Sequence, residues 1–189
     1  MFNLLPQVKY LLFYLVVMLL CALTSQAGAE NLIKLPEKQG YLLLDVDVGG
    51  VAYLHYSKYL TSQQLGKDRV MDLNEDEIGF KLIPLFAGRY QITEIRAPFF
   101  NLPYKLNTIK QKKWQFTIEP GKINYIGKLT IARERTKDDV DIQLRNRIAT
   151  DIDRIQSIYA RELENYGLVV GSGYQDSFLQ EYQGGSTNE

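Results

Sequence analysis

Short segments in which apolar and polar residues alternate dominate the chain between residues 40 and 133. The second half of Tyr41–Val48 has leucine or valine at every other position and aspartate between them, and Tyr90–Ile95 alternates strictly. A period of two residues indicates strands with one buried face. Gly49–Gly50 is a hairpin signal, and Pro120–Gly121 fits a type II turn. Short strands separated by such turns predict an antiparallel β-sandwich over residues 40–133.

The expected strands are separated by polar stretches and by proline or glycine. A polar connection is expected over Ser57–Asp68 and a loop over Pro98–Pro103, and residues 30–39 form an extended leader ahead of the sandwich. The expected strands are Tyr41–Val48, Val51–Tyr56, Arg69–Leu73, Ile78–Ile83, Tyr90–Ile95, Trp114–Ile118 and Ile123–Ala132.

The apolar period changes after the sandwich. Between residues 138 and 166 apolar residues recur every three or four positions, which predicts one long C-terminal α-helix. Gly167 is a natural end for this helix, and Leu168–Val170 could add an edge strand. Residues 171–189 are rich in Gly, Ser and Gln and are expected to form a flexible tail. The apolar helical positions are Val140, Leu144, Ile148, Ile152, Ile155, Tyr159 and Leu163.

Residues 1–29 have the pattern of a signal peptide. Lys9 supplies a positive charge, and the apolar run Tyr10–Leu23 is shorter than a helix needs to cross a bilayer core of about 30 Å. The small residues of Ala27–Ala29 predict cleavage after Ala29 and a periplasmic or secreted chain without a transmembrane span. An uncleaved anchor and lipid attachment at Cys21 remain open as alternatives.

Charge and composition exclude several classes of protein. The 22 basic and 22 acidic residues balance, so the chain lacks the basic field of a general nucleic-acid binder. Cys21 is the only cysteine and is lost with the signal peptide, which excludes thiol catalysis and cysteine-bound zinc. No phosphate-binding glycine loop or hydrolase motif is present. We therefore expect no enzyme, no cofactor and no metal.

Two turn segments share one pattern. Ile118–Gly127 has the sequence IEPGKINYIG, and Leu82–Ile92 likewise joins a strand, a glycine corner and a following aromatic residue. Ile118–Gly127 resembles the signature pGk-nYiG of a group of uncharacterised bacterial envelope proteins. Both turns resemble those of the prealbumin-like sandwiches in carboxypeptidase regulatory-like domains. The resemblance covers roughly residues 78–132 and implies the fold, but it brings no catalytic residue.

The candidate catalytic and metal-binding side chains are few. His55 is the only histidine, and a structural role explains it better than a metal site, which needs further soft ligands. Asp45 and Asp47 share one strand face at about 7 Å, a spacing that glycosidase acids also have. Any such pair on a strand meets this distance, so a solvated face is the better interpretation. Asn74–Glu77 lacks the spacing of a calcium loop.

Two further segments could contact a ligand. Lys110, Lys112 and Lys113 precede Trp114 and could meet an anionic surface, although lysines at a strand entry more often protect a sheet edge. The aromatic loop residues either plug one end of the sandwich or bind a partner protein. We take them as the candidate partner-binding residues, namely Phe99, Phe100 and Tyr104.

These observations predict an exported envelope protein that acts as a non-catalytic interaction or accessory module. Its expected partner is another envelope protein, and nucleic acid is excluded. The alternative is a carbohydrate- or peptidoglycan-binding module that stacks tyrosine and tryptophan rings on sugars. A hydrolase that uses Asp45, Asp47 and His55 is a third, weaker hypothesis.

Overall fold

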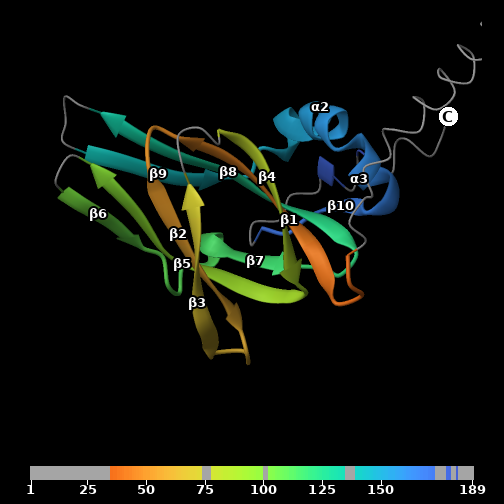
Figure 1. The fold of residues 1–189 in the computed structure, drawn as a ribbon, viewed down its shortest axis with the longest axis horizontal. Helices are drawn as coiled ribbons and strands as arrows, with labels where there is room; N and C mark the ends of the chain where they lie inside the picture. The colour runs from red at the N-terminus through yellow and green to blue at the C-terminus, as the bar shows by residue number, and fades with distance from the viewer. Residues whose placement is uncertain are drawn as a thin grey trace, which may run out of the picture. The chain divides into compact units, whose positions relative to one another are not determined.

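In the part of the chain that the structure describes, the fold is mainly β and consists of two sheets, here sheet A and sheet B, with short α-helices (Figure 1). No described helix is long and apolar enough to span a membrane. The compact unit that holds these elements begins at Leu35. The computed structural model describes residues 35–73, 78–99, 102–134 and 139–172 and residues 178, 179 and 182.

Sheet A contains β1 (Gln39–Val48), β4 (Gly79–Phe86), β8 (Lys122–Glu134), β9 (Asp139–Arg145) and β10 (Gly167–Val170). Its order is β10-β8-β1-β4, and β9 pairs with the later part of β8. β8 runs parallel to β1 and β10, so the prediction of a purely antiparallel sandwich is wrong for this sheet. Parallel neighbours need a long connection, and the chain between β1 and β8 provides one by passing through sheet B.

Sheet B is antiparallel throughout and contains β2 (Ala52–Tyr59), β3 (Leu65–Leu73), β5 (Gly88–Phe99), β6 (Leu102–Asn107) and β7 (Gln115–Ile118). Its order is β3-β2-β5-β6, and β7 pairs with the first part of β5. Much of the expected connection and of the expected loop is therefore strand, because the β2–β3 hairpin and the β5–β6 pair are longer than their alternating cores suggest.

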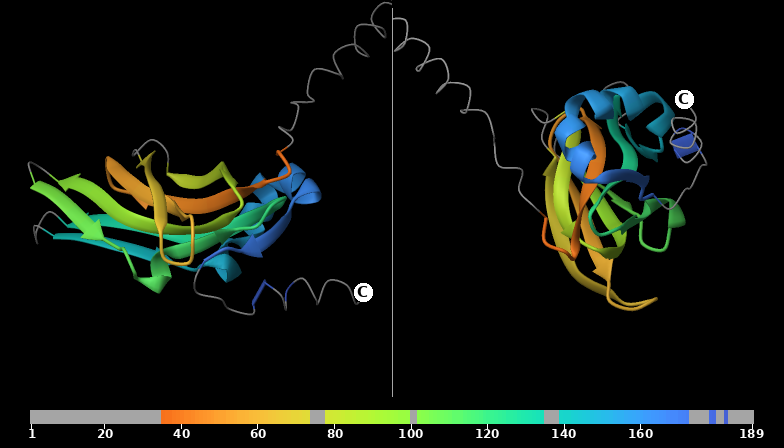
Figure 2. Two further views of the ribbon diagram at one scale, coloured as in Figure 1. Left: turned by 90° about the horizontal axis from the view of Figure 1, so that it is seen from below. Right: turned by 90° about the vertical axis from the view of Figure 1, so that its right-hand side faces the viewer.

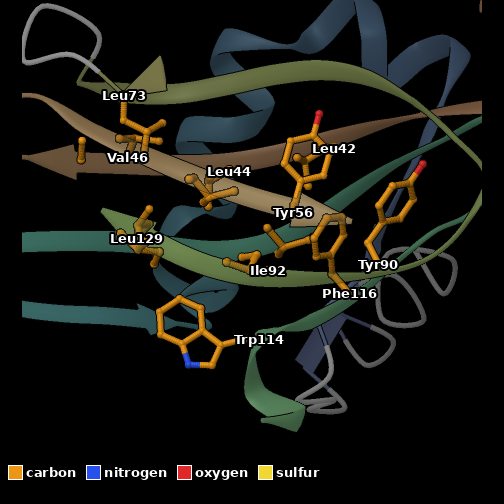
Figure 3. Packing of buried hydrophobic residues seen from close by; sticks show 14 of the residues in the cluster. Leu42, Leu44, Val46, Tyr56, Leu73, Tyr90, Ile92, Trp114, Phe116 and Leu129 are labelled. Atoms are coloured by element: carbon orange, nitrogen blue, oxygen red, sulfur yellow. The ribbon is translucent and has the colours of Figure 1, made fainter. Parts of the chain in front are cut away.

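The main hydrophobic core lies between the two sheets, as Figure 3 shows. Leu44 and Val46 of β1 point into it and are fully buried, as their alternation with aspartate predicts. Trp114 is 1 % exposed at the edge of this core, and the ring of Phe116 stacks on Tyr90 with 5.1 Å between centroids. A tryptophan in this position has no free face to stack on a sugar.

A second apolar cluster lies on the other face of sheet A. Figure 2 shows the helices beside this sheet. Tyr41 and Leu43 alternate with the core-facing leucines of β1 and meet the helices α2 (Ile148–Ile158) and α3 (Ala160–Asn165). The apolar stripe of α2 supplies this contact through Ile148, Ile152 and Ile155, all buried. The first part of β1 is thus buried on both faces, which explains the unbroken run of apolar residues there.

The long helix predicted over residues 138–166 is not present. Its first part is β9, in which Val140, Ile142 and Leu144 pair with β8 and pack against the core between the sheets. Val140 and Leu144 fit a helical spacing of four, but Ile142 between them gives the period of two that the sheet uses. The remaining part divides at Tyr159, where the backbone leaves the helical region between α2 and α3.

Several residues of the predicted tail have a defined place in the fold. Leu179 is 4 % exposed and belongs to the apolar cluster under α2, and Phe178 packs against the same cluster. Gly171 and Ser172 also contact the sheets, since the amide of Gly171 donates to the carbonyl of Tyr125 and Ser172 forms a bridge to Phe116.

The residues of Ile118–Gly127, which carry the resemblance to envelope proteins, have structural roles in the fold. Gly121 has a φ of +63° and makes the turn before β8. Gly127 has a φ of +123°, and a side chain there would lie 2.5 Å from the carbonyl oxygen of Arg145. Asn124 is fully buried and bonds to the turn and to β1. The Tyr125 hydroxyl donates to Asp151 of α2. The resemblance in this segment therefore reflects the turn and the packing that these residues form, and it does not indicate a binding site.

Candidate binding groove

A groove of about 330 Å³ lies on the face of sheet B that is turned away from the core. Four adjacent strands contribute to it, because residues two apart on each strand point to the same face. The groove combines aromatic and proline side chains with charged ones and one imidazole. Its lining residues are Tyr53, His55, Val70, Asp72, Arg96, Pro98, Pro103, Tyr104 and Lys105.

The strand register places four of these side chains in one row across the sheet. Tyr53 of β2 is paired with Asp72 of β3 on one side and with Arg96 of β5 on the other, and Arg96 is paired in turn with Lys105 of β6. Arg96 also forms an ion pair with Glu94 on its own strand. An aromatic ring thus lies between an acidic and a basic side of the groove.

His55 is held by a carboxylate at the edge of this row. Its Nδ1 lies 2.8 Å from Oδ2 of Asp68, whose Oδ1 accepts hydrogen bonds from Ser57 at 3.2 Å and Thr93 at 3.0 Å. Burial alone would raise the pKa of Asp68, but the bonds from His55 and Thr93 outweigh it and lower the pKa below its usual value. The carboxylate is therefore ionised at neutral pH.

An ionised carboxylate only accepts hydrogen bonds, so Nδ1 of His55 carries the proton. In the neutral imidazole the lone pair is then on Nε2, which makes no hydrogen bond to another described residue. His55 is 8 % exposed and lines the groove. The geometry agrees with the expected hydrogen-bonded histidine and also fixes which nitrogen a ligand in the groove would meet.

The hydrolase constellation considered for Asp45, Asp47 and His55 is not assembled, because the aspartates belong to sheet A and the histidine to sheet B. Asp45 is 2 % exposed, so a solvated face is wrong at this residue. Its Oδ2 has no hydrogen-bond partner and lies 3.8 Å from the ammonium of Lys128, which pairs more closely with Asp47 at 2.9 Å.

Burial raises the pKa of Asp45, and the nearby carboxylate of Asp151 adds to the rise. Lys128 and Arg154 lower this pKa without cancelling the effect of burial. The hydroxyl of Tyr125 donates to Asp151 at 2.7 Å, and burial together with this bond keeps the tyrosine protonated. The bond from Tyr125 of β8 to Asp151 joins α2 to sheet A.

This cluster predicts a pH effect on stability. A carboxyl with a folded-state pKa above its unfolded value near 3.8 favours the folded protein at low pH and loses that contribution as pH rises through the folded pKa. The loss is at most about 1.4 kcal/mol per pH unit. The asparagine of Asp45→Asn does not titrate. The free energy of unfolding of this variant minus that of the wild type should therefore increase from pH 4 to pH 7. Urea denaturation of both proteins measures this, and a constant difference would contradict the assignment.

The predicted partner-binding residues are only partly placed by the structure. Tyr104 is half-buried and lines the groove, while Phe100 and the side chain of Phe99 lie outside the described residues. The candidate calcium segment Asn74–Glu77 lies outside them as well. Within the described part of the chain, no three His, Cys, Asp or Glu side chains are grouped to hold a metal.

The basic segment before Trp114 is not part of the groove. The ammonium of Lys113 lies 5.5 Å from the centre of the Trp114 ring, and this ring is buried. The charged and aromatic groove residues that sequence analysis missed are Tyr53, Asp72, Arg96 and Lys105. In the sequence these residues are recognisable only as polar or aromatic positions of alternating strands. Alternation does not show which strands become neighbours, so it does not predict that these residues meet.

A second hollow, of about 440 Å³, lies between α2, α3 and β10. Its walls are mostly apolar and include Ile152, Leu163 and Leu168. Leu179 and Tyr182 from the C-terminal segment also line it, so the chain covers part of this hollow itself.

No family model matches this chain, and no curated protein or solved structure is significantly similar to it.

Proposed function

We propose that this protein is an exported, non-catalytic binding module of the cell envelope and that its ligand site is the groove on sheet B. The observation that carries the proposal is the gathering of aromatic, basic and acidic side chains from four strands into one hollow. A rigid sheet holds such side chains in fixed positions, which favours binding. The signal-peptide pattern of residues 1–29 supports export.

The hydrogen bonding around His55 supports a non-catalytic role. A serine nucleophile needs a base within hydrogen-bond reach, and the base needs a group that orients it. Here Asp68 orients the imidazole, but the hydroxyl of Ser57 donates to that same carboxylate. The serine is therefore bound to the orienting group, and no proton path from its hydroxyl to Nε2 is formed.

Site-specific photocross-linking in cells tests the proposal. A benzophenone amino acid replaces Val70 in the groove or, as the matched control, Ile158 on α2; these residues are 52 % and 56 % exposed. We expect an adduct from position 70 only, either a discrete protein band or material retained with the envelope polysaccharide. The captured chain should begin at Glu30. An absent adduct at position 70, or equal adducts at both positions, would reject the groove as the ligand site.

A further inference from the structure

The groove favours one ligand chemistry over the others. We propose that it binds a saccharide that carries a carboxylate, with a sugar ring on Tyr53 and the carboxylate beside Lys105. This inference rests on the proposed function, because it names the ligand of the same groove.

A ligand on this face of sheet B meets side chains and little backbone. β2 is paired with β3 and β5, and β5 is paired with β2 on one side and with β6 and β7 on the other. The ladders thus use the main-chain donors and acceptors of both central strands. An extended peptide usually binds through such groups at an unpaired edge. Recognition by side chains alone suits the hydroxyls and C–H faces of a sugar better.

The centre of the groove suits the uncharged part of a sugar. Tyr53 is half-buried at the centre of the row and offers an apolar ring with a polar tip. The carboxylate of Asp72 and the lone pair on Nε2 of His55 are hydrogen-bond acceptors on the same face. A sugar supplies hydroxyl donors to both acceptors and can lay a C–H face on the neighbouring ring of Tyr53.

The basic side of the groove suits a carboxylate on the ligand. Arg96 and Lys105 are neighbours in the register, and Glu94 pairs with Arg96. Lys105 is exposed and has no ion-pair partner among the described residues. A ligand carboxylate beside Lys105 would form a charge-assisted hydrogen bond at the rim of the groove. The acidic side chain of Asp72 lies at the opposite end of the row, which fixes the direction of such a ligand.

The test compares tetragalacturonate with the neutral galactotetraose by calorimetry on the full mature chain. We expect the acidic oligosaccharide to bind about tenfold more tightly at low salt, and added salt to reduce the difference. Lys105→Gln should weaken binding of the acidic oligosaccharide by about tenfold and leave the neutral one unchanged. Lys38→Gln makes the same charge change at an exposed position before β1 and should change neither affinity.

The ring contact is tested separately at Tyr53. Tyr53→Ala should weaken binding of both oligosaccharides by at least about tenfold, whereas Tyr53→Phe keeps the ring and should retain the binding. Circular dichroism and thermal unfolding show whether the alanine variant is folded, and the phenylalanine variant keeps the comparison valid if it is not.

The outcomes separate this inference from the proposed function. Equal affinity for the two oligosaccharides overturns the carboxylate assignment. If neither oligosaccharide binds and position 70 still cross-links to a protein, the saccharide inference fails and the binding module stands. If neither binds and position 70 gives no adduct, both fail.

Discussion

Gly40→Ala is expected to destabilise the protein by about 4 kcal/mol or to prevent folding. A Cβ atom at this position would lie 2.1 Å from the carbonyl oxygen of Glu119, with the side chains of Asn124 and Ile118 at 3.1 Å. Glu119 precedes the Pro120–Gly121 turn, and the amide of Gly121 donates to the carbonyl of Gln39. The obstacle is therefore backbone that is bonded to the start of β1, and it has little room to move.

Gly49→Ala is the matched control for this experiment. A Cβ there would meet only the carbonyl oxygen of Ile131 at 3.8 Å, an ordinary contact. We expect a change below about 1 kcal/mol for this variant. Urea denaturation of the two variants and the wild type gives both values. A cost for Gly40→Ala no greater than that for Gly49→Ala would contradict the close approach of β1 and the turn.

Asn124→Ala is expected to cost about 3 kcal/mol, because it leaves several buried backbone groups without partners. The side-chain oxygen accepts from the amide of Glu119 at 2.8 Å. The side-chain nitrogen donates to the carbonyls of Tyr41 and Lys122, both at 3.0 Å. This one side chain thus ties the turn before β8 to the first residues of β1.

Asn107→Ala provides the comparison. Its side-chain oxygen also accepts a backbone amide bond, from Ile109 at 3.0 Å, but the residue is exposed and water can replace the contact. We expect less than about 1 kcal/mol for this variant in the same denaturation series. Similar costs at positions 107 and 124 would show that the buried network does not stabilise the turn. Asn124→Asp should be at least as damaging as alanine, because it places a carboxylate beside the carbonyls of Tyr41 and Lys122.

The sequence of residues 39–48 was informative because its pattern carries two signals at once. The alternation of Leu44, Val46 and Val48 with aspartate predicted a strand with one face in the core, which is confirmed. The unbroken apolar residues before it indicate a strand buried on both faces, and only the structure shows that helices cover the second face. Asp45 was misjudged for the same reason, since α2 covers the face on which it lies.

Residues 138–166 show the limit of local pattern. The spacing of Val140 and Leu144 fits a helix, and Ile142 fits a strand, so local periodicity supports both. The free edge of β8 decided between them, because pairing there satisfies the backbone of residues 139–145 and lets these three side chains reach the core. Such a partner lies outside the segment and is absent from its sequence.

By itself, the sequence determined that this protein is mainly β, where most of its strands lie and which of their residues face the core, because these depend on local periodicity and turn chemistry. The tertiary structure decided the parallel pairing of β1 with β8, the cover over sheet A and the row formed by Asp72, Tyr53, Arg96 and Lys105. Those features depend on which strands become neighbours. Strand order is set by the packing of the whole core, and the groove exists only because that order places the β2–β3 pair beside the β5–β6 pair.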